Sequence, residues 1–379
     1  MKTGWQLVPM GKLCSISSGE SDTQDAVIDG PYAFFDRSKT IKRSSRFLYD
    51  CEALIIPGEG KEFFPKHFNG KFDLHQRAYA LFDFRPDLDV RFLYHFLHHR
   101  SDYFPSVAVG ATVKSLRRRH FENLPVPIPP LPEQQRIVGL LDEAFAGIAT
   151  AKTNAEKNLQ NARALFESHL QGVFTQRGAG WVEKPLGELA TFRNGINYTK
   201  DSKGERIKIV GVRNFQKHFS APLDDLDTVT IDGKLSELDS LKQDDILAVR
   251  SNGNIDLIGR CILVGEVTGK ISHSGFTIRI RLSNSSVLPK YVCHFMKSAG
   301  SRKLLTEGGT GTNIKSLNQG MLSALAIPFP PFAAQKVLVD QIQSLSEETQ
   351  RLASLSQRKL AALDSLKKSL LHKAFTGEL

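Results

Sequence analysis

The clearest hydrophobic pattern along the chain is a helical repeat of apolar positions that occurs twice. In residues 133–175 there is no proline, and apolar side chains recur at spacings of three, four and seven. Residues 334–376 carry a similar seam. These spacings predict two long amphipathic helices with coiled-coil character. The residues expected to pack between helices are Ile137, Leu141, Ile148, Leu338, Leu345 and Leu352.

The two helical stretches have the same length, since no insertion separates them. At 1.5 Å per residue each would extend roughly 65 Å. Neither stretch can bury its apolar seam alone, so we expect the helices to pack antiparallel against each other as a spacer.

Shorter patterns surround these helices and predict mixed α and β structure. Apolar runs at 53–56 and 77–82 favour buried strands, and 92–97 favours a short helix with aromatic packing. Residues 181–326 repeat this α+β pattern with a longer middle. Proline-rich segments at 124–132 and 327–332 precede the helices. Alternating prolines favour a stiff extended linker that packs along a neighbouring surface.

The chain is therefore an internal repeat made of two copies. Near the start the copies are offset by 176 residues, an offset that still relates Arg37 to Arg213, and from Gly110 onward the offset is 201. The second copy is longer only in its middle. The pairs that define the first offset are Trp5, Pro9, Gly11, Leu13 and Gly19 with Trp181, Pro185, Gly187, Leu189 and Gly195.

This repeat predicts an α+β protein with two small α/β domains separated by two long antiparallel helices. We place the first domain at 1–132, the first spacer helix at 133–177, the second domain at 178–333 and the second helix at 334–379. A pseudo-two-fold, quasi-circular arrangement is expected, with the two chain ends adjacent.

Composition narrows the class of partner. The 379 residues include 50 Lys and Arg against 40 Asp and Glu, a formal charge of +10. A basic surplus favours a polyanion such as nucleic acid. There is no apolar run long enough for a signal peptide or a membrane span, and four scattered cysteines fit reduced thiols, so a cytoplasmic protein is expected.

Sequence motifs for catalysis are weak. No phosphate-binding Gly-x-x-x-x-Gly-Lys loop is present, and the Pro-Pro-Phe at 330–332 lacks the polar residue of an amino-methyltransferase motif. Glu59-Gly-Lys61 matches the tail of a nuclease motif but is better explained as a turn. The histidines are not spaced as metal ligands, and we predict no metal site and no catalytic residue.

Basic and amide side chains are the stronger signal. Lys and Arg neutralise phosphates, while Arg and Asn can hydrogen-bond base edges. Lys114 and Lys315 hold corresponding positions in the two copies, as do Arg37 and Arg213. The predicted DNA-binding residues are Arg37, Lys39, Lys42, Arg43, Lys114, Arg117, Arg118, Arg213, Asn214, Lys217, Arg250, Asn252, Asn254 and Lys315.

The segment Leu124-Pro-Val-Pro-Ile-Pro-Pro-Leu-Pro-Glu-Gln-Gln-Arg-Ile-Val138 closely resembles the one that follows each target-recognition domain in type I restriction–modification specificity subunits. A weaker copy runs from Ile327 to Val339, and Asp245–Arg250 with the following Asn252-Gly253 looks like the strand and loop of those domains. The first domain departs from this pattern, because the segment around Glu52–Pro57 lacks the Asn-Gly loop.

The resemblance implies a non-catalytic DNA specificity subunit. Each recognition domain would read one half of a bipartite, asymmetric double-stranded target. The helices would space the domains and dock two DNA-methyltransferase subunits, and through them any restriction or translocase subunits. No cofactor would bind this chain, because S-adenosylmethionine would belong to the methyltransferase.

Two other classes stay open at this stage. A self-contained methyltransferase or nuclease with an unrecognised active site would modify or cleave DNA by itself. A coiled-coil scaffold with no nucleic-acid role would bind no DNA.

Overall fold

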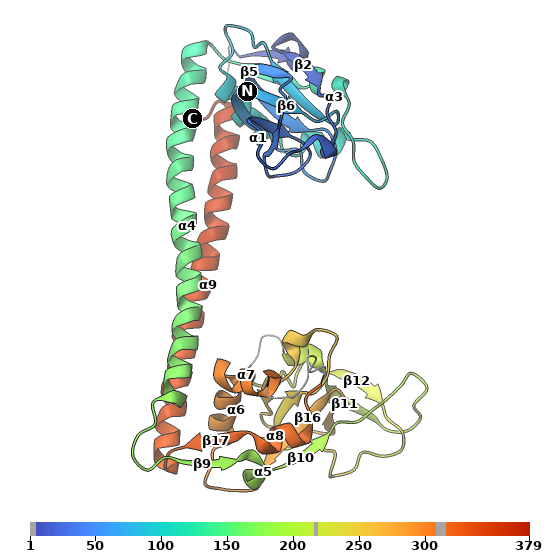
Figure 1. Ribbon diagram of the computed structural model, residues 1–379, viewed down its shortest axis with the longest axis vertical. Helices are drawn as coiled ribbons and strands as arrows, with labels where there is room; N and C mark the ends of the chain where they lie inside the picture. Colours follow the sequence, from blue (N-terminus) through green and yellow to red (C-terminus); the bar gives the residue numbers. More distant parts are fainter. Residues whose placement is uncertain (1–4, 216–218, 308–315) are drawn as a thin grey trace. The chain divides into compact units, whose positions relative to one another are not determined.

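The computed structural model describes residues 5–215, 219–307 and 316–379, and the chain divides into two compact units (Figure 1). Unit 1 comprises Met1–Glu156 and Ser356–Leu379, and unit 2 comprises Lys157–Leu355. Each unit holds one sheet-rich domain and part of the two long helices, α4 (Leu131–Thr175) and α9 (Phe332–Thr376). The predicted combination of two mixed α/β domains with two equally long helices is confirmed.

Unit 1 contains a six-stranded sheet in the order β2-β7-β5-β6-β3-β4. All its pairs are antiparallel except β3 with β6. The predicted strands at 53–56 and 77–82 and the helix at 92–97 are present. The elements are η1 (Met10–Lys12), β2 (Ser15–Ser18), η2 (Thr23–Asp25), β3 (Tyr32–Phe35), β4 (Lys42–Ser44), β5 (Tyr49–Pro57), β6 (Lys66–Leu74), β7 (Ala78–Phe82), α1 (Val90–His99), α2 (Tyr103–Val107) and α3 (Arg118–Glu122).

Both faces of the unit 1 sheet are covered, which explains the continuous apolar run in β5. Side chains alternate along a strand, so Leu54 and Ile56 face one side and Ala53 and Ile55 the other. Leu54 and Ile56 belong to a core that includes α1, and Ala53 and Ile55 belong to a smaller aromatic core around Phe72.

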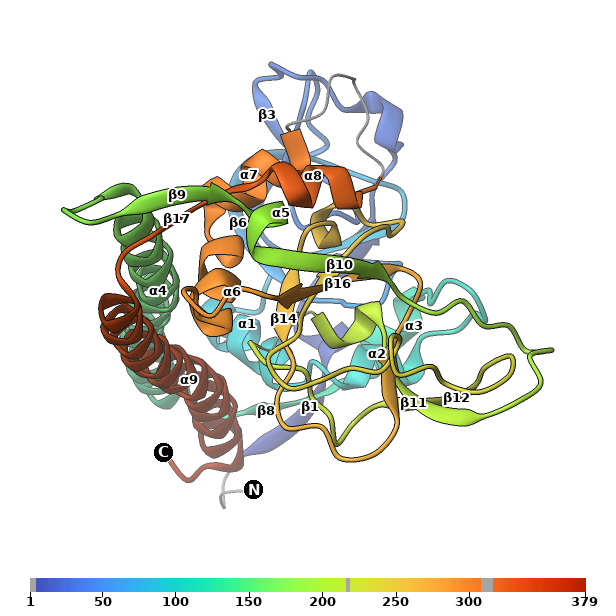
Figure 2. The ribbon, with the colours of Figure 1, turned by 90° about the horizontal axis from the view of Figure 1, so that it is seen from below.

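Unit 2 repeats this plan with its sheet divided (Figure 2). A four-stranded sheet has the order β10-β16-β13-β14, and a three-stranded sheet has the order β12-β11-β15. As in unit 1, a single pair in these sheets, β11 with β15, is parallel. The elements are α5 (Leu186–Leu189), β10 (Ala190–Asn194), β11 (Arg206–Val210), η3 (Val212–Phe215), β12 (Asp227–Thr230), β13 (Ile246–Val249), η4 (Ile255–Leu257), β14 (Cys261–Leu263), β15 (Ile271–His273), β16 (Thr277–Leu282), α6 (Pro289–Lys297), α7 (Ala299–Glu307) and α8 (Gln319–Ala324).

The parallel pairs show which strands correspond in the two domains. Phe35 of β3 lies opposite Leu74 of β6, and Val210 of β11 lies opposite His273 of β15. Part of the extra length of the second domain follows β11. The connection from β11 to β12 covers residues 211–226, whereas that from β3 to β4 covers only 36–41.

The proline-rich segments form short strands rather than free linkers. β8 (Pro125–Ile128) pairs with β1 (Gln6–Pro9), and β17 (Ala326–Phe329) pairs with β9 (Val182–Pro185). In β8 the prolines occupy every second position, so the residues between them can supply the ladder hydrogen bonds. Proline is compatible with such an isolated two-stranded ladder because its missing N–H faces away from the partner.

The long helices pack antiparallel within each unit. In unit 1, Lys367 lies over the ring of Phe145 and Lys152 forms an ion pair with Asp364, so the partner number falls as the α4 number rises. In unit 2, Leu170 shares a core with Val339 and Ile342.

The seam on α4 follows the prediction, whereas the seam on α9 is displaced. Ile137, Leu141 and Ile148 are buried. Leu338 and Leu345 are only partly buried, and Leu352 is 37% exposed. The buried positions of α9 in this region are Gln335, Val339, Ile342, Thr349 and Ser356, several of them polar. Leu338 still packs against the unit 2 core, so of the three predicted positions on α9 only Leu352 is exposed.

Each sheet-rich domain also packs on the end of a long helix. Phe375 of α9 contacts Phe92 and Phe96 in unit 1, at centroid distances of 5.1 and 5.4 Å. Phe174 of α4 contacts Tyr291 and Phe295 in unit 2, at 5.5 and 5.2 Å. The repeat thus extends to the aromatic packing.

The two ends of the described chain meet in unit 1, as the quasi-circular prediction requires. Trp5 and Leu379 pack against the same core, and Arg136 Nη2 donates to the carbonyl of Leu379 at 2.7 Å. Within the described ranges, none of the helices has the length and apolar character needed to span a bilayer.

Candidate nucleic-acid interface

Several chain segments that are distant in sequence converge at one end of the unit 1 sheet. The amide of Gly58, just after β5, donates to the carbonyl of Arg77 at 2.8 Å. Leu116 N donates to Gly58 O at 2.7 Å, and Gly60 N donates to Lys114 O at 3.0 Å. Main-chain hydrogen bonds therefore fix the loop 58–60 against the turn before β7 and the segment before α3.

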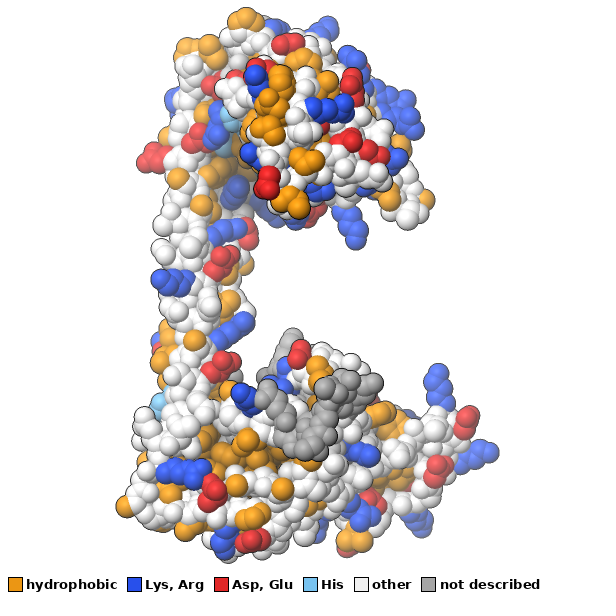
Figure 3. Space-filling model, viewed as in Figure 1, with side chains coloured by type: hydrophobic (Ala, Val, Ile, Leu, Met, Phe, Trp, Pro, Cys, Tyr) orange, Lys and Arg blue, Asp and Glu red, His pale blue; other side chains and the backbone are white. Residues whose placement is uncertain are grey.

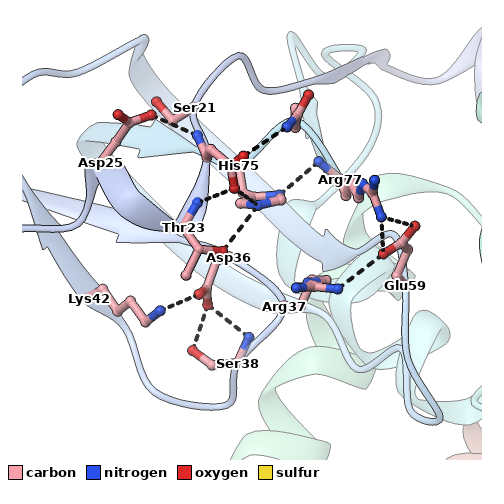
Figure 4. A network of polar contacts seen from close by, with 12 residues as sticks. Ser21, Thr23, Asp25, Asp36, Arg37, Ser38, Lys42, Glu59, His75 and Arg77 are labelled. Carbon is pink, nitrogen blue, oxygen red and sulfur yellow. Dashed lines mark hydrogen bonds and ion pairs between the residues drawn. The ribbon is translucent and has the colours of Figure 1, made fainter. Parts of the chain in front are cut away.

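Glu59 is the centre of a polar cluster at this place (Figure 4). Arg77 Nη1 donates to both carboxylate oxygens at 3.0 Å, and Arg37 Nη1 donates to Oε2 at 3.1 Å. Ser115 Oγ adds a contact to Oε1 at 3.3 Å. One carboxylate thus holds two arginines, whose side chains remain about half exposed.

The environment of Glu59 favours its charged form. Burial alone would raise its pKa, but the hydrogen bond and charge of Arg77, the hydrogen bond from Ser115 and the charge of Arg37 together lower the pKa below its ordinary value. The nuclease-like Glu59-Gly-Lys61 is therefore part of an arginine-holding turn. In the described parts of the chain, no cluster of three or more His, Cys, Asp or Glu could hold a metal.

The loop after β3 is ordered by a second carboxylate. Asp36 accepts hydrogen bonds from Ser38 N at 2.8 Å and Ser38 Oγ at 2.6 Å, and it pairs with Lys42 Nζ at 2.6 Å. Burial raises the pKa of Asp36, but these donors outweigh burial and lower it overall. Lys66 Nζ donates to Ser38 O at 2.7 Å. Lys42 therefore stabilises the loop after β3 through its ion pair with Asp36.

The other predicted basic residues of unit 1 are on its surface, where Figure 3 shows Lys and Arg side chains along the margin of the upper sheet-rich domain. Lys39 pairs with Glu62 at 2.9 Å, and Arg118 pairs with Glu122 at 2.8 Å. Arg43, Lys114 and Arg117 are exposed. Exposed ion pairs of this kind contribute little to stability, so their cations can be redirected to phosphates at small cost.

Unit 2 brings corresponding segments together with different side chains. Arg250 N donates to Phe276 O at 2.8 Å and Leu317 N donates to Arg250 O at 2.7 Å. Arg250 and Phe276 therefore stand where unit 1 has Gly58 and Arg77.

The loop after Arg250 is exposed and shaped by its own asparagines. Asn252 Oδ1 accepts from Asn254 N at 2.8 Å, and Asn254 Oδ1 accepts from Asp256 N at 3.0 Å. These bonds use the amide oxygens and leave each Nδ2 group as a donor at the surface.

Asn214 does not share that exposure. Its side chain is 4% exposed, its Oδ1 accepts from Gly211 N at 2.9 Å and its Nδ2 donates to Asp225 O at 3.4 Å. It stabilises the turn after β11, which corrects the prediction that it contacts DNA. Lys217 and Lys315 lie outside the described residues.

Arg37 and Arg213 follow corresponding strands but not at corresponding positions. Arg37 is the second residue after Phe35, whereas Arg213 is the third after Val210. Their partners also differ, because Arg213 Nε pairs with Asp227 at 2.8 Å rather than with an equivalent of Glu59. The offset of 176 that relates Arg37 to Arg213 in the sequence therefore does not match the strands, because Phe35 corresponds to Val210.

Sequence reasoning missed Arg77 and the structural role of Glu59. Arg77 was assigned to a buried strand, but β7 begins one residue later, at Ala78. A signal existed in the polar His75-Gln76-Arg77 before the apolar run, which is typical of a turn.

Two tandem α/β domains on a pair of antiparallel helices, with exposed arginines gathered where the strands end, define a doubled recognition protein suited to a polyanionic partner. Residues 2–160 match the family model described as type I restriction modification DNA specificity domain. Together with the relatives below, this match makes the chain similar to the specificity subunits of type I restriction–modification systems over nearly its whole length.

Relatives match nearly the whole chain, and two of them illustrate the similarity. The type I restriction enzyme StySPI specificity subunit of Salmonella potsdam is 25% identical, covering 98% of this chain and 82% of its own. The EcoDI specificity subunit of Escherichia coli is 23% identical, covering 99% and 88%. These names support a non-catalytic DNA-target-recognition subunit over a self-contained modifying enzyme.

Solved structures show the same fold. A chain from a study of complex assembly and conformational transition in the type I R-M system has a TM-score of 0.75 at 16% identity, covering 100% of this chain and 99% of that one. The HsdS subunit from Thermoanaerobacter tengcongensis has a TM-score of 0.58 at 14% identity, covering 100% and 98%.

Proposed function

We propose that each sheet-rich domain reads one half of a bipartite, asymmetric double-stranded DNA target, and that the paired helices set the distance between the halves. The proposal rests on one observation. The two domains share a main-chain framework, but they differ in the side chains that this framework presents at the surface. The same main-chain bonds join the converging segments in both units, but Gly58, Glu59 and Arg77 in one unit correspond to Arg250, Ser251 and Phe276 in the other.

Affinity would come from phosphate contacts and specificity from base contacts. Exposed cations release counterions from DNA when they bind, so binding should weaken steeply with salt. Arg250 and the Nδ2 groups of Asn252 and Asn254 can donate to base edges. The cations that we assign to phosphates are Arg37, Lys39, Arg43, Lys114, Arg117, Arg118 and Arg213.

The helices would also dock the methyltransferase. A specificity subunit of this family assembles with a methyltransferase and DNA; that two methyltransferase subunits bind, one per domain, is our proposal. Exposed apolar side chains on the helix surface of unit 2, Leu165, Val337, Leu352 and Leu355, support a partner there. Restriction or translocase subunits, where present, would join through the methyltransferase.

The chemistry would belong to those partners. S-adenosylmethionine would bind the methyltransferase, and this chain would bind no cofactor. The complex would act in the cytoplasm, where its DNA substrate is found.

Mapping modified adenines across the host genome, with and without this chain, tests the proposal. A two-part motif that disappears when the chain is deleted is the expected result. A motif without two separated halves would contradict bipartite reading. Methyl transfer or cleavage by the purified chain alone would contradict a non-catalytic subunit.

A further inference from the structure

The turn that precedes the last strand of each recognition sheet has the same construction in both units. In unit 1, residues 75–77 connect β6 to β7, and in unit 2, residues 274–276 connect β15 to β16. Gln76 N donates to Ser21 O at 2.8 Å, and Gly275 N donates to Ile196 O at 2.8 Å. The turn is therefore tied in both units to the segment that follows the first sheet strand.

A glycine close to each turn allows this approach. A Cβ on Gly19 would lie 1.8 Å from Leu74 O, and one on Gly195 would lie 2.2 Å from Ser274 O. No other residue fits so close to a carbonyl oxygen. Gly19 and Gly195 also form one of the pairs that first revealed the repeat, so the duplicated frame includes the support for these turns.

Each turn ends in a large exposed side chain, and the two side chains differ in chemistry. Arg77 is 57% exposed and Phe276 is 60% exposed. Exposure of a phenylalanine on a tightly fixed turn is unusual for packing alone, and it suits a surface that a partner covers. Both turns lie beside residues already assigned to DNA contact, Arg37 in unit 1 and Arg250 in unit 2.

Arg77 is also held in a defined orientation. Its main-chain N–H donates to His75 Nδ1 at 2.9 Å, and its Nη1 binds both oxygens of Glu59. Nε and Nη2 are thus left on the outer edge of the guanidinium. An edge with two parallel donors matches the O6 and N7 acceptors of guanine in the major groove.

We infer that these corresponding turns read bases, with Arg77 donating to a purine edge in one half of the target and Phe276 making an apolar contact, such as with a thymine methyl group, in the other half. Glu59 and His75 are positioning residues for Arg77. This inference rests on the proposed function, because it assumes that each domain reads one half-site.

The test uses the complete complex with its methyltransferase, and it measures both the modified motif in cells and binding to DNA duplexes substituted at each position. Arg77→Ala should relax preference about ten- to hundredfold at one or two positions of one half-site and leave the other half unchanged. Phe276→Ala should relax a position in the opposite half-site. Arg77→Lys keeps the charge but not the paired donors, and it should lose the same preference with an unchanged melting temperature.

Two matched controls use residues outside the turns. Arg85 has a side chain that is 39% exposed, is paired with Asp87 at 2.5 Å and lies beyond the opposite end of β7. Leu238 is 63% exposed in unit 2. Arg85→Ala and Leu238→Ala should keep the wild-type motif.

Two results would overturn the inference. An unchanged motif in Arg77→Ala and Phe276→Ala would show that the turns do not read bases. Weaker binding to all sequences alike, with a smaller salt dependence for Arg77→Ala, would make Arg77 a phosphate contact. Failure of the proposed function is a separate result, because the unsubstituted complex would then give no two-part motif.

Discussion

Gln134 and Gln335 make the same three hydrogen bonds at the starts of the two long helices. Gln134 Oε1 accepts from Asp89 N at 2.8 Å, while its Nε2 donates to Asp87 O at 2.8 Å and Pro129 O at 2.9 Å. Gln335 repeats this set with Leu288 N, Ser286 O and Pro330 O at 2.8, 2.8 and 2.9 Å. Both side chains are fully buried. A single amide therefore joins the proline-rich segment, the entry to the domain helix and the long helix.

Replacing either glutamine should destabilise its own unit. Gln134→Ala leaves a buried N–H and two carbonyl groups without partners, so the free energy of unfolding should fall by about 2–4 kcal/mol. Gln335→Ala should give a similar loss in unit 2. Urea unfolding followed by circular dichroism measures the effect, and Gln135→Ala, next to Gln134 but exposed, is the control. Equal losses in Gln134→Ala and Gln135→Ala would contradict the role of the buried amide.

Changing the exposed leucines of α9 should impair assembly without unfolding the chain. Leu352 and Leu355 lie one turn apart and are both exposed, so Leu352→Glu with Leu355→Glu should leave the melting temperature within a few degrees. A charge in an apolar interface is costly, and methyltransferase binding should weaken at least tenfold. Titration calorimetry or co-purification measures this. Arg351→Glu on a neighbouring exposed position tests for a simple charge effect, and unchanged assembly in the double variant would exclude this face.

Acid should destabilise both units before the carboxylates are protonated. Burial first, and then nearby lysines, lowers the pKa of His98 and His294 from 6.5 to about 4. The unfolded histidines take up protons below pH 6.5 while the folded ones do not, so stability is lost as pH falls from 6.5 towards 4. Each histidine contributes at most about 3 kcal/mol of this loss. Unfolding midpoints measured from pH 7.5 to 4 should fall less in His98→Gln with His294→Gln, and parallel curves would contradict the assignment.

Lengthening both helices together should lengthen the spacer between the two half-sites. Seven residues inserted after Glu156 and seven after Leu355 add two turns to each helix, or about 10.5 Å. At about 3.4 Å per base pair, the motif should gain about three unspecified base pairs while both halves keep their sequence. An insertion in one helix alone shifts the antiparallel register and should abolish assembly. If the double insertion leaves the spacer of the motif unchanged, the helices do not set the distance between the half-sites.

The long helices could be predicted from sequence because their signal is local. Thirty or more residues without proline, and apolar positions at helical spacing, suffice to predict a helix. The register of α9 could not be predicted, because its buried stripe includes Gln335, Thr349 and Ser356. Burial of these residues depends on partners in α4 and in the second domain, which the spacing does not encode.

The proposed DNA-binding surface was predictable only in part, because the sequence shows local charge but not the contacts between distant segments. The charge of Arg37 and Lys114 pointed to a basic surface, and their common location in unit 1 is a property of the sheet. Glu59 and Arg77 join this cluster through strand pairing between distant segments, which no local pattern contains. Asn214 looks like a base-reading residue in sequence and is used inside its turn.

The aromatic contacts at the helix ends have a consequence for how such a chain can arise. Phe375 completes the domain that begins the chain, and Phe174 holds the corresponding place in the other domain. A fragment ending near residue 177 would lack Phe375 but would carry Phe174, so two fragments could exchange helix ends and complete each other. Such a domain-swapped pair would be symmetric and would suit an inverted repeat. Gene duplication and fusion of that ancestor would free each half to diverge, as the unlike residues Arg77 and Phe276 already have.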